Sequence, residues 1–323
     1  MIKSIALCAA ISAACAVVSP ALAATDYPSH SVTMIVAYPP GGSTDTAARL
    51  VAENMSKKLG QTFVVENRPG AGGTIGASLV ARSNPNGYTL LFGASAETSI
   101  APATMENIPF NIETDFKPIS LVGKVPFLLV ANPGFPPNNV SELIKYAKEH
   151  PHEVNFSSFG NNTSNHLTGE LFNSLAGVKM THIPYKGSGP SITDLVGGQV
   201  QVSFDTVTAV LPLVQGGKLK ALAVTTAERS AMAPNVPTLD ESGIKGFIAG
   251  TWFGLLAPSG TPDEITGKLS KTIAEVLNDP SLSKQFADRG ITPAATTPDE
   301  FKTFIRSEIS KWKNLPKEPK GGQ

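Results

Sequence analysis

Cysteine is nearly missing from this 323-residue chain, because its two cysteines, Cys8 and Cys15, both lie within the first 24 residues. The same stretch has the three parts of a cleavable secretory signal: Lys3, an apolar run from Ile5 to Val18, and the small residues Ala21-Leu22-Ala23. Such a run is too short and wrongly flanked for a membrane anchor. We therefore predict a signal peptide at residues 1–24.

The mature chain would contain no thiol. Disulfide bonds and thiolate catalysis are thereby excluded, and an oxidising compartment such as the periplasm is favoured. A lipid on Cys15 is disfavoured, because Ser12 stands where a bulky aliphatic residue normally precedes a lipidation site.

Neither sign of charge is in excess. The chain has 26 Lys and Arg against 26 Asp and Glu, and removal of Lys3 with the signal leaves a net charge of −1. No basic run is long enough to predict nucleic-acid or membrane-surface binding. A mature chain of roughly 300 residues is longer than one core usually serves, which predicts two domains.

Metal, cofactor and nucleophile motifs are also missing. The five histidines occur without an HExxH pattern or nearby cysteines, so we predict no metal site. Gly70 to Gly76 approaches a dinucleotide fingerprint, but its third glycine falls one position late, so no cofactor is predicted. The nearest approach to a nucleophile elbow, Gly93 to Glu97, lacks the final glycine.

One stretch does indicate a binding site. Val32 to Ala37 predicts a buried strand, Tyr38-Pro39-Pro40-Gly41-Gly42 predicts a tight turn, and apolar residues at helical spacing predict a helix from about Ser43 to Leu59. The first N–H groups of a helix have no intrahelical partner, so this turn is suited to an anion. The alternative is an ordinary strand-to-helix connection with its own caps.

Strand-like and helix-like segments then alternate along the chain, which predicts an α/β fold with mainly parallel sheets flanked by helices. Residues 93–117 are polar and poorly periodic and are expected to form a long connection. The chain after residue 258 is expected to contain helices only. The further strands are expected at 62–66, 88–92, 119–131, 154–157, 180–183, 200–204, 219–225 and 247–257. Helices are expected at 74–82, 191–196, 209–215, 262–278, 281–289 and 299–315. A further helix is expected to start at Ser141, and another, with Leu167, Leu171, Phe172 and Leu175 on one side, is expected to stop at Gly177.

The long apolar segments 119–131 and 247–257 are expected to cross between two lobes and to form a hinge. We predict lobe 1 at residues 25–125 and 249–323, and lobe 2 at residues 126–248. Polar residues follow several predicted strands: Ser95 and Thr98, Ser157 to His166, and Asp205, Thr206 and Thr208. Because ligands bind beyond the carboxyl ends of strands in open α/β sheets, we expect a cleft lined by hydroxyls and amides. Any one of these polar residues alone would be read as a helix cap.

Several motifs follow one another along the chain: the segments 38–45 (YPPGGSTD), 65–76 (VENRPGAGGTIG), 85–91 (PNGYTLL), 166–172 (HLTGELF), 183–188 (IPYKGS), 194–200 (DLVGGQV) and 252–262 (WFGLLAPSGTP). With these motifs in this order, the chain resembles the periplasmic solute-binding proteins of tripartite tricarboxylate transporters, the Bug or TctC-like family. The match spans nearly the whole mature chain.

The resemblance implies a two-lobed, type II-like venus-flytrap fold, in which the lobes close on a small carboxylate and deliver it to membrane permease subunits. It implies a monomer without cofactor or catalytic residues. The ligand would be a di- or tricarboxylate, an aromatic carboxylate or an acidic amino acid. The implied ligand-binding residues are Tyr38, Gly41, Gly42, Ser43 and Asp45 (which would brace its loop), then Ser158, Gly160, Asn161, Thr163 and Ser164 opposite, with Ser95, Asp205, Thr206 and Thr251 as walls.

Glu97 departs from the family pattern, because it places an acid in a loop that is usually neutral or occupied by histidine. Either the ligand carries a donor there, or Glu97 points away from it. Two other functions stay open at this point: a periplasmic ligand sensor that docks onto a signalling receptor, and an α/β enzyme that acts on carboxylates.

Overall fold

The computed structural model describes residues 27–313, so the predicted signal peptide and the last ten residues lie outside the described part. The chain alternates strands and helices as the sequence pattern predicts. The strands of the first half are β1 (Val32–Val36), β2 (Phe63–Asn67), β3 (Thr89–Ala94) and β4 (Phe116–Ala131), and its helices are α1 (Ser43–Leu59), the 3₁₀ turn η1 (Ala71–Gly73), α2 (Thr74–Ala81), the π-helical turn η2 (Ala96–Ile100) and α3 (Ala101–Thr104).

The second half continues the alternation and then becomes mostly helical. Its strands are β5 (Asn155–Ser158), β6 (Thr181–Pro184), β7 (Val202–Thr206), β8 (Lys220–Val224), β9 (Gly250–Pro258) and β10 (Thr292–Pro293), and its helices are α4 (Val140–Glu149), α5 (Ser164–Ala176), α6 (Ser188–Val196), α7 (Val207–Gln215), α8 (Asp263–Leu277), α9 (Pro280–Ala287) and α10 (Pro298–Lys313).

The strands follow the order β2-β1-β3-β9-β4-β7-β5-β6, with β8 and β10 paired to β4. Pairing is parallel between β1 and its neighbours β2 and β3, and between β5 and its neighbours β6 and β7. Pairing is antiparallel wherever β4 or β9 takes part. The fold is therefore a mixed α/β structure, in which two parallel units are joined by two antiparallel strands.

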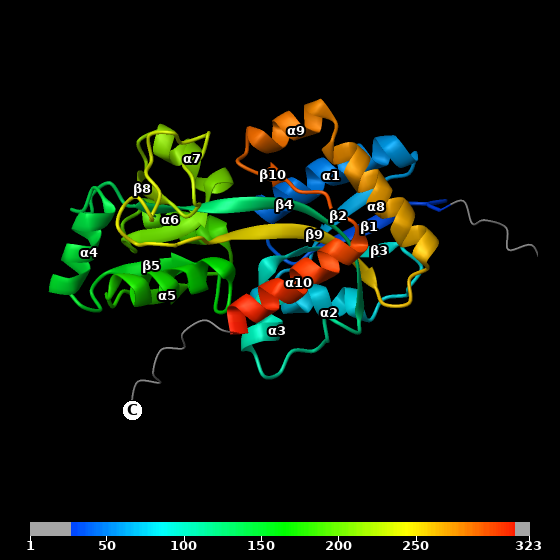
Figure 1. Ribbon diagram of the computed structural model, residues 1–323, viewed down its shortest axis with the longest axis horizontal. Coiled ribbons are helices and arrows are strands. Elements are labelled where there is room, and N and C mark those ends of the chain that lie inside the picture. The colour runs from blue at the N-terminus through cyan, green and yellow to red at the C-terminus, as the bar shows by residue number, and fades with distance from the viewer. Residues whose placement is uncertain (1–26, 314–323) are drawn as a thin grey trace, which may run out of the picture.

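The long strand β4 connects the two halves of the molecule, as Figure 1 shows. Its residues Phe116–Pro126 pair with β9, whereas Phe127–Ala131 pair with β7 and β8. At the change of partner, the Thr225 hydroxyl accepts the N–H of Phe127 at 2.9 Å and donates to the Ala249 carbonyl at 2.7 Å. The strand β4 therefore changes its partners between Pro126 and Phe127. The boundaries near residues 125 and 249 stay a prediction, and we use the names lobe 1 and lobe 2 for the predicted ranges.

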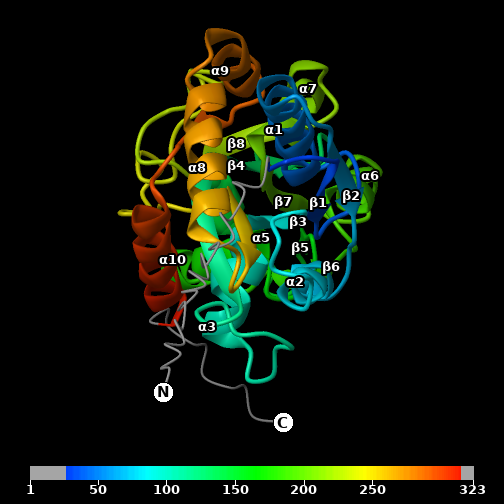
Figure 2. The same ribbon diagram turned by 90° about the vertical axis from the view of Figure 1, so that its right-hand side faces the viewer.

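Helices cover both faces of each sheet. In lobe 1, α1 and α8 lie on one face and α2 and α10 on the other (Figure 2). Alternate residues of β1 divide accordingly, since Met34 packs with the α1 side and Ile35 packs with the α2 side. In lobe 2, Leu195 of α6 and Phe172 of α5 belong to different core clusters, because the two helices cover different faces of the sheet. The apolar faces of these helices are buried against the sheets. The loops beyond the ends of the strands are not needed for this packing and can form a binding site.

Two expectations are corrected. Residues 93–117 are not a plain connection, because η2 and α3 occupy residues 96–104. The π-helical turn buries the polar side chains Glu97, Thr98 and Ser99, so it lacks the apolar periodicity from which a helix is predicted. The chain after residue 258 is not purely helical either, because Thr292 and Pro293 pair with Lys124 and Gly123 of β4. A strand of two residues is too short for an alternating pattern.

Candidate functional site

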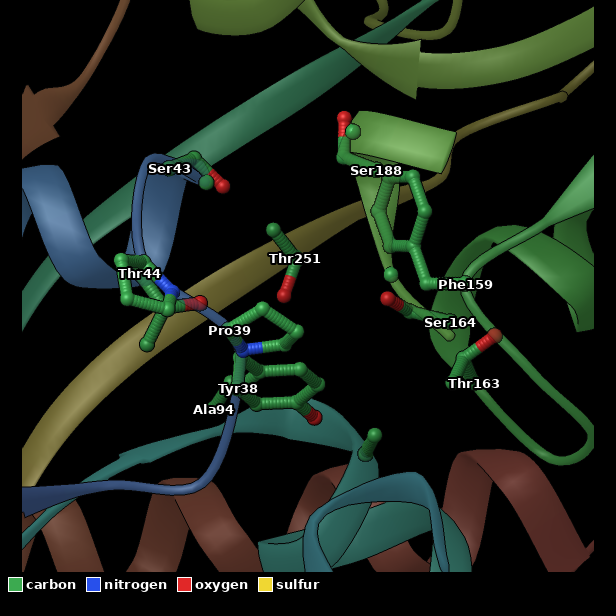
Figure 3. A pocket seen from close by; sticks show the side chains of 15 residues that line it. Tyr38, Pro39, Ser43, Thr44, Ala94, Phe159, Thr163, Ser164, Ser188 and Thr251 are labelled. Carbon is green, nitrogen blue, oxygen red and sulfur yellow. The ribbon is translucent and has the colours of Figure 1, made fainter. Parts of the chain in front are cut away.

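A cavity of about 50 Å³ lies between the lobes, and Figure 3 shows side chains that face each other across it. It exceeds the ~10–15 Å³ that one water needs, so it has room for a small molecule only. We call it the interlobe cavity. Its lining from lobe 1 is Tyr38, Pro39, Pro40, Gly42, Ser43, Thr44, Ala94, Ala96 and Thr251, and from lobe 2 it is Phe159, Thr163, Ser164, Gly187, Ser188 and Gly189.

Three helices begin at this cavity. The N-cap residues are Gly42 for α1, Thr163 for α5 and Gly187 for α6, and none of them makes a side-chain capping hydrogen bond. The residues that follow, Ser43 and Ser164 among them, also line the cavity. Because the first N–H groups of a helix lack intrahelical partners and carry the positive end of its dipole, the cavity is suited to an anion.

The turn before α1 is held by Asp45. Its carboxylate accepts the Gly41 N–H at 3.0 Å, an Asn67 Nδ2–H at 2.9 Å and the Arg49 guanidinium. Partial burial opposes ionisation, but these donors, led by Arg49, keep the pKa of Asp45 below its usual value. Gly41 has φ +88°, a conformation that glycine adopts without strain. Asp45 thus fixes the loop that opens the α1 end to the cavity.

The opposing loop of lobe 2 is held by its own hydroxyls and amides. The Thr163 hydroxyl bonds to the Gly160 carbonyl at 2.7 Å, and Asn165 Oδ1 accepts the Phe159 N–H at 3.3 Å. Ser158 is buried, and its Oγ is hydrogen-bonded to Nε2 of His182. The hydrogen bonds of Thr163 and Asn165 join residues of the same loop, and the side chain of the N-cap residue Thr163 makes no capping bond to α5.

The lobes touch at the rim of the cavity. A Cβ on Gly187 of lobe 2 would lie 3.2 Å from Cγ of Pro39 in lobe 1, and a Cβ on Gly72 would lie 3.3 Å from the Asn161 carbonyl oxygen. Both glycines have positive φ, and both are in close contact with the opposite lobe. The two lobes therefore lie close together at the rim of the cavity.

Two buried acids stand behind the lining. The Tyr38 hydroxyl donates to Glu97 Oε2 at 2.7 Å, and the Ser188 hydroxyl donates to Asp205 at 3.0 Å. Both carboxyls are fully buried, and burial raises the pKa of each to about 7. Glu97 does not line the cavity. Of the two alternatives given for Glu97 above, its position fits the second, in which the side chain points away from the ligand.

A groove of about 800 Å³ lies elsewhere, along the strands that cross between the lobes. Its lining includes Lys124, Glu228, Arg229, Glu308 and Lys311, and it includes no first-turn residue of a helix. The interlobe cavity is the better candidate, because its donors converge from both lobes.

Comparison with known proteins identifies the family. The model of the tripartite tricarboxylate transporter family receptor, TctC, matches residues 47–320. The chain belongs to the TctC family. Because this is a family of solute-binding receptors, the expectation that the protein is not an enzyme is confirmed. The family membership that the sequence motifs indicate is thereby confirmed.

Relatives of this TctC-family receptor match over nearly their full length. Protein BugT of Bordetella pertussis is 41% identical over 298 residues, which cover 92% of this chain and 91% of BugT. The structure of R. palustris Rpa4515 with adipate is 36% identical, with a TM-score of 0.87 over 89% of this chain and 96% of that one. MatC from Rhodopseudomonas palustris with bound malate is 35% identical, with a TM-score of 0.84 over 89% and 99%. The predicted two-lobed binding-protein fold is thereby confirmed.

The TctC-family receptor has no helix within residues 27–313 that is long and apolar enough to cross a membrane. Within the same residues there is no cluster of three or more His, Cys, Asp or Glu side chains suited to a metal ion.

The structure brings six of the fourteen predicted site residues of this TctC-family receptor to the cavity lining: Tyr38, Gly42, Ser43, Thr163, Ser164 and Thr251. The other eight lie behind or beside it. In lobe 1, Gly41 and Asp45 brace the α1 turn, and Ser95 is hydrogen-bonded to the Thr251 hydroxyl at 2.9 Å. In lobe 2, Ser158 and Gly160 share a hydrogen bond within their loop, and Asn161 lies at the contact between the lobes. Asp205 and Thr206 are hydrogen-bonded to each other behind Ser188. A ligand-binding role for any of the fourteen stays a prediction.

Sequence reasoning missed the α6 end of the site, formed by Gly187, Ser188 and Gly189. The helix was expected from Ser191, but it begins at Ser188 and accommodates Pro190 in its first turn. The sequence did contain a signal, because the Gly-Ser pair Gly187-Ser188 lies between a predicted strand and a helix, as Gly42-Ser43 does. Pro39, Pro40 and Phe159 also line the cavity and lie within segments that the sequence indicates as binding loops. Thr44, Ala94 and Ala96 line it too and were not predicted as binding residues.

Proposed function

We propose that the protein is a periplasmic receptor that captures a small organic carboxylate by closing its two lobes and delivers it to the permease subunits of a tripartite tricarboxylate transporter. The observation that carries the proposal is the meeting of three helix N-termini without side-chain caps at one cavity. Adipate and malate in the structures of two relatives support a carboxylate as the ligand. The predicted signal peptide and the family's name support the periplasm and the permease.

The ligand would be neutralised by dipoles rather than by cations. Among the described residues, the lining contains no Lys, Arg or His. Lys186, adjacent to Gly187, is exposed and does not line the cavity. Main-chain N–H groups and hydroxyls from both lobes contact the same small space, so a bound carboxylate gains all of its contacts only when the lobes are closed. Closure then follows from the difference in contacts between the open and closed states.

A glycine-to-valine substitution tests this site. Gly42 has no atom within 4 Å of an added Cβ and a φ of −76°, so valine fits the backbone but places its side chain beside the N–H groups of α1. We expect Gly42→Val to remove the binding of adipate and malate in calorimetry while the protein stays folded. Gly267→Val is the matched control, since Gly267 lies in α8 with open space around it and does not line the cavity. Equal affinity in Gly42→Val and in the unmodified protein would remove this turn from the site.

Delivery to a permease needs a separate test. Uptake of radiolabelled adipate or malate in cells that contain the permease should fall when the receptor is deleted and should return with the unmodified receptor but not with Gly42→Val. Uptake that is independent of the receptor would contradict the transport role and leave carboxylate binding intact.

A further inference from the structure

The buried carboxyls Glu97 and Asp205 occupy equivalent places in the two lobes. Glu97 lies in η2, directly after β3 of lobe 1, and Asp205 lies in β7 of lobe 2. Both are fully buried, and neither lines the interlobe cavity. Each is hydrogen-bonded to the hydroxyl of a residue that does line it, Tyr38 for Glu97 and Ser188 for Asp205. The cavity thus has a hydroxyl backed by a buried acid on each side.

In lobe 1, Glu97 Oε1 accepts the N–H of Ala94 at 2.6 Å and Oε2 accepts the hydroxyl of Tyr38 at 2.7 Å. Tyr38 is the titratable group in contact with Glu97. The strand β3 and the elements η1 and α3 contain no ionisable side chain. The helix α10 packs against η2, but its Glu308 is bonded to Nε1 of Trp252 and lies 3.8 Å from Lys311. Among the described residues, no cation contacts Glu97.

In lobe 2, Asp205 Oδ1 accepts the Thr206 N–H at 2.7 Å, and Oδ2 lies nearest the Ser188 hydroxyl at 3.0 Å. The neighbouring elements direct their ionisable groups elsewhere. In β4, which pairs with β7, Lys117 is bonded to Asp263 and Lys124 lies over the ring of Phe304. Asp194 of α6 accepts the Tyr185 hydroxyl, His166 of α5 lies 3.7 Å from Glu170, and His182 of β6 bonds to Ser158. The strand β5 and the helix α7 contain no ionisable side chain. Among the described residues, no cation contacts Asp205.

This arrangement sets the direction of two hydroxyl hydrogens. When Glu97 and Asp205 are ionised, Tyr38 and Ser188 donate to them and present only lone pairs to the cavity. A carboxylate ligand would then meet two acceptors and two buried negative charges. When the acids are protonated, each can donate its own hydrogen to the hydroxyl oxygen, and the hydroxyl hydrogen turns to the ligand. Protonation therefore removes a repulsion and adds a donor on each side of the cavity.

We propose that Glu97 and Asp205 are positioning residues that couple the capture of a carboxylate anion to the uptake of protons, by controlling whether the hydroxyls of Tyr38 and Ser188 donate to the ligand. The proposal rests on the function proposed above. It adds that the receptor binds its anion together with a proton at one or both buried acids.

The sign of the pH dependence follows from linkage. Burial raises the pKa of both carboxyls to about 7 in the protein without ligand, and an adjacent anion raises them further. Binding then takes up protons above pH 7, where the free acids ionise. Between pH 6 and pH 7 the affinity changes little, and above pH 7 it falls by up to about tenfold per pH unit for each acid, until the acids ionise in the complex as well.

Isosteric amides test the proposal. In Glu97→Gln, the Ala94 N–H requires the amide oxygen at the Oε1 position, so the amide nitrogen lies at Oε2 and donates to Tyr38, as the protonated acid would. Asp205→Asn acts in the same way on Ser188, because the Thr206 N–H fixes the amide oxygen at Oδ1. Asp194→Asn is the matched control, since Asp194 accepts a tyrosine hydroxyl at the same 2.7 Å distance but outside the cavity lining.

The measurement is isothermal titration calorimetry with malate and with adipate between pH 6 and pH 9, repeated at pH 7.5 in phosphate and in Tris. The two buffers differ in ionisation enthalpy, so the difference in heat gives the number of protons taken up. We expect uptake by the unmodified protein and by Asp194→Asn, less uptake and a shallower pH profile in each single amide variant, and a flat profile in the double variant. At pH 9 the double variant should bind more tightly than the unmodified protein.

Equal binding enthalpies in the two buffers, or amide variants with the proton uptake of the unmodified protein, would overturn the coupling while leaving carboxylate capture in place. Absence of binding to malate and to adipate at every pH would overturn the proposed function and the coupling together. A variant that fails to fold would show in its thermal melt, and the remaining single variant then decides the outcome.

Discussion

The burial of Glu97 has a measurable effect on stability without any ligand. Its pKa is about 7 in the folded protein, against 4.5 for an ordinary glutamate, because burial disfavours the charged carboxylate more than the hydrogen bonds from Ala94 and Tyr38 favour it. The folded state therefore holds the proton more tightly than the unfolded state does. The resulting stabilisation is fully present below pH 4.5 and is lost as the pH rises through 7.

The size of the effect follows from the two pKa values. A rise from 4.5 to about 7 corresponds to about 3 kcal/mol over the whole titration, of which about 2.5 kcal/mol falls between pH 5 and pH 8. The amide of the Glu97→Gln variant cannot ionise, so this variant lacks the dependence. We expect the free energy of unfolding of Glu97→Gln, relative to that of the unmodified protein, to increase by about 2–3 kcal/mol between pH 5 and pH 8. Any loss common to both pH values is the structural cost of the amide.

Urea unfolding followed by circular dichroism at pH 5 and pH 8 measures this double difference. Asp240→Asn is the control, because hydrogen bonds from the Gly246 N–H and from Lys245 lower the pKa of Asp240 below 3.8 and its titration lies outside that window. Its difference from the unmodified protein should be the same at both pH values. If the difference for Glu97→Gln were also the same at both, Glu97 would be ionised in the folded protein at both pH values, as it is in the unfolded chain, and the reasoning on buried acids would fail.

Two further predictions concern the loops of the site. The rings of His166 and His182 pack against each other with centroids 3.9 Å apart and planes inclined by 31°, and burial lowers the pKa of both to about 4. Their neutral forms therefore stabilise the fold above pH 6.5, and this contribution is lost as the pH falls towards 4. His182→Phe should therefore lose less stability than the unmodified protein between pH 7 and pH 4.5 in urea unfolding, and an unchanged loss would contradict the assignment. Asn67→Ala removes the Nδ2–H bonds to Asp45 and to the Tyr38 carbonyl, which should cost about 1–3 kcal/mol of stability and weaken malate and adipate binding in calorimetry. Unchanged affinity would mean that the α1 turn keeps its shape without this brace.

Much of the fold could be predicted from local pattern. The first strand, turn and helix were expected within one residue of Val32–Val36 and Ser43–Leu59, because an apolar run, a glycine pair and a helical apolar stripe are all local signals. The order of the strands was not predictable in this way. That β9 lies between β3 and β4 depends on pairing between residues more than 100 positions apart.

The candidate site was predictable where one segment supplies both the turn and the helix start, as at Gly42 and Ser43. It was not predictable where the decisive contact joins distant segments. Tyr38 and Glu97 are 59 positions apart, and nothing in the sequence around Glu97 indicates that its carboxyl meets a tyrosine hydroxyl. The role of Asp205 behind Ser188 was hidden for the same reason, because the side chains come from different elements.

The absence of side-chain caps on α1, α5 and α6 has a consequence for how a loaded molecule differs from an empty one. A carboxylate seated in the interlobe cavity would serve as the missing cap of three helices at once. The opening turns of these helices would then exchange their amide hydrogens more slowly in the loaded protein than in the empty one. The rim of the cavity would therefore be stiffer in the loaded protein than in the empty one, so the two states would differ in rigidity as well as in shape.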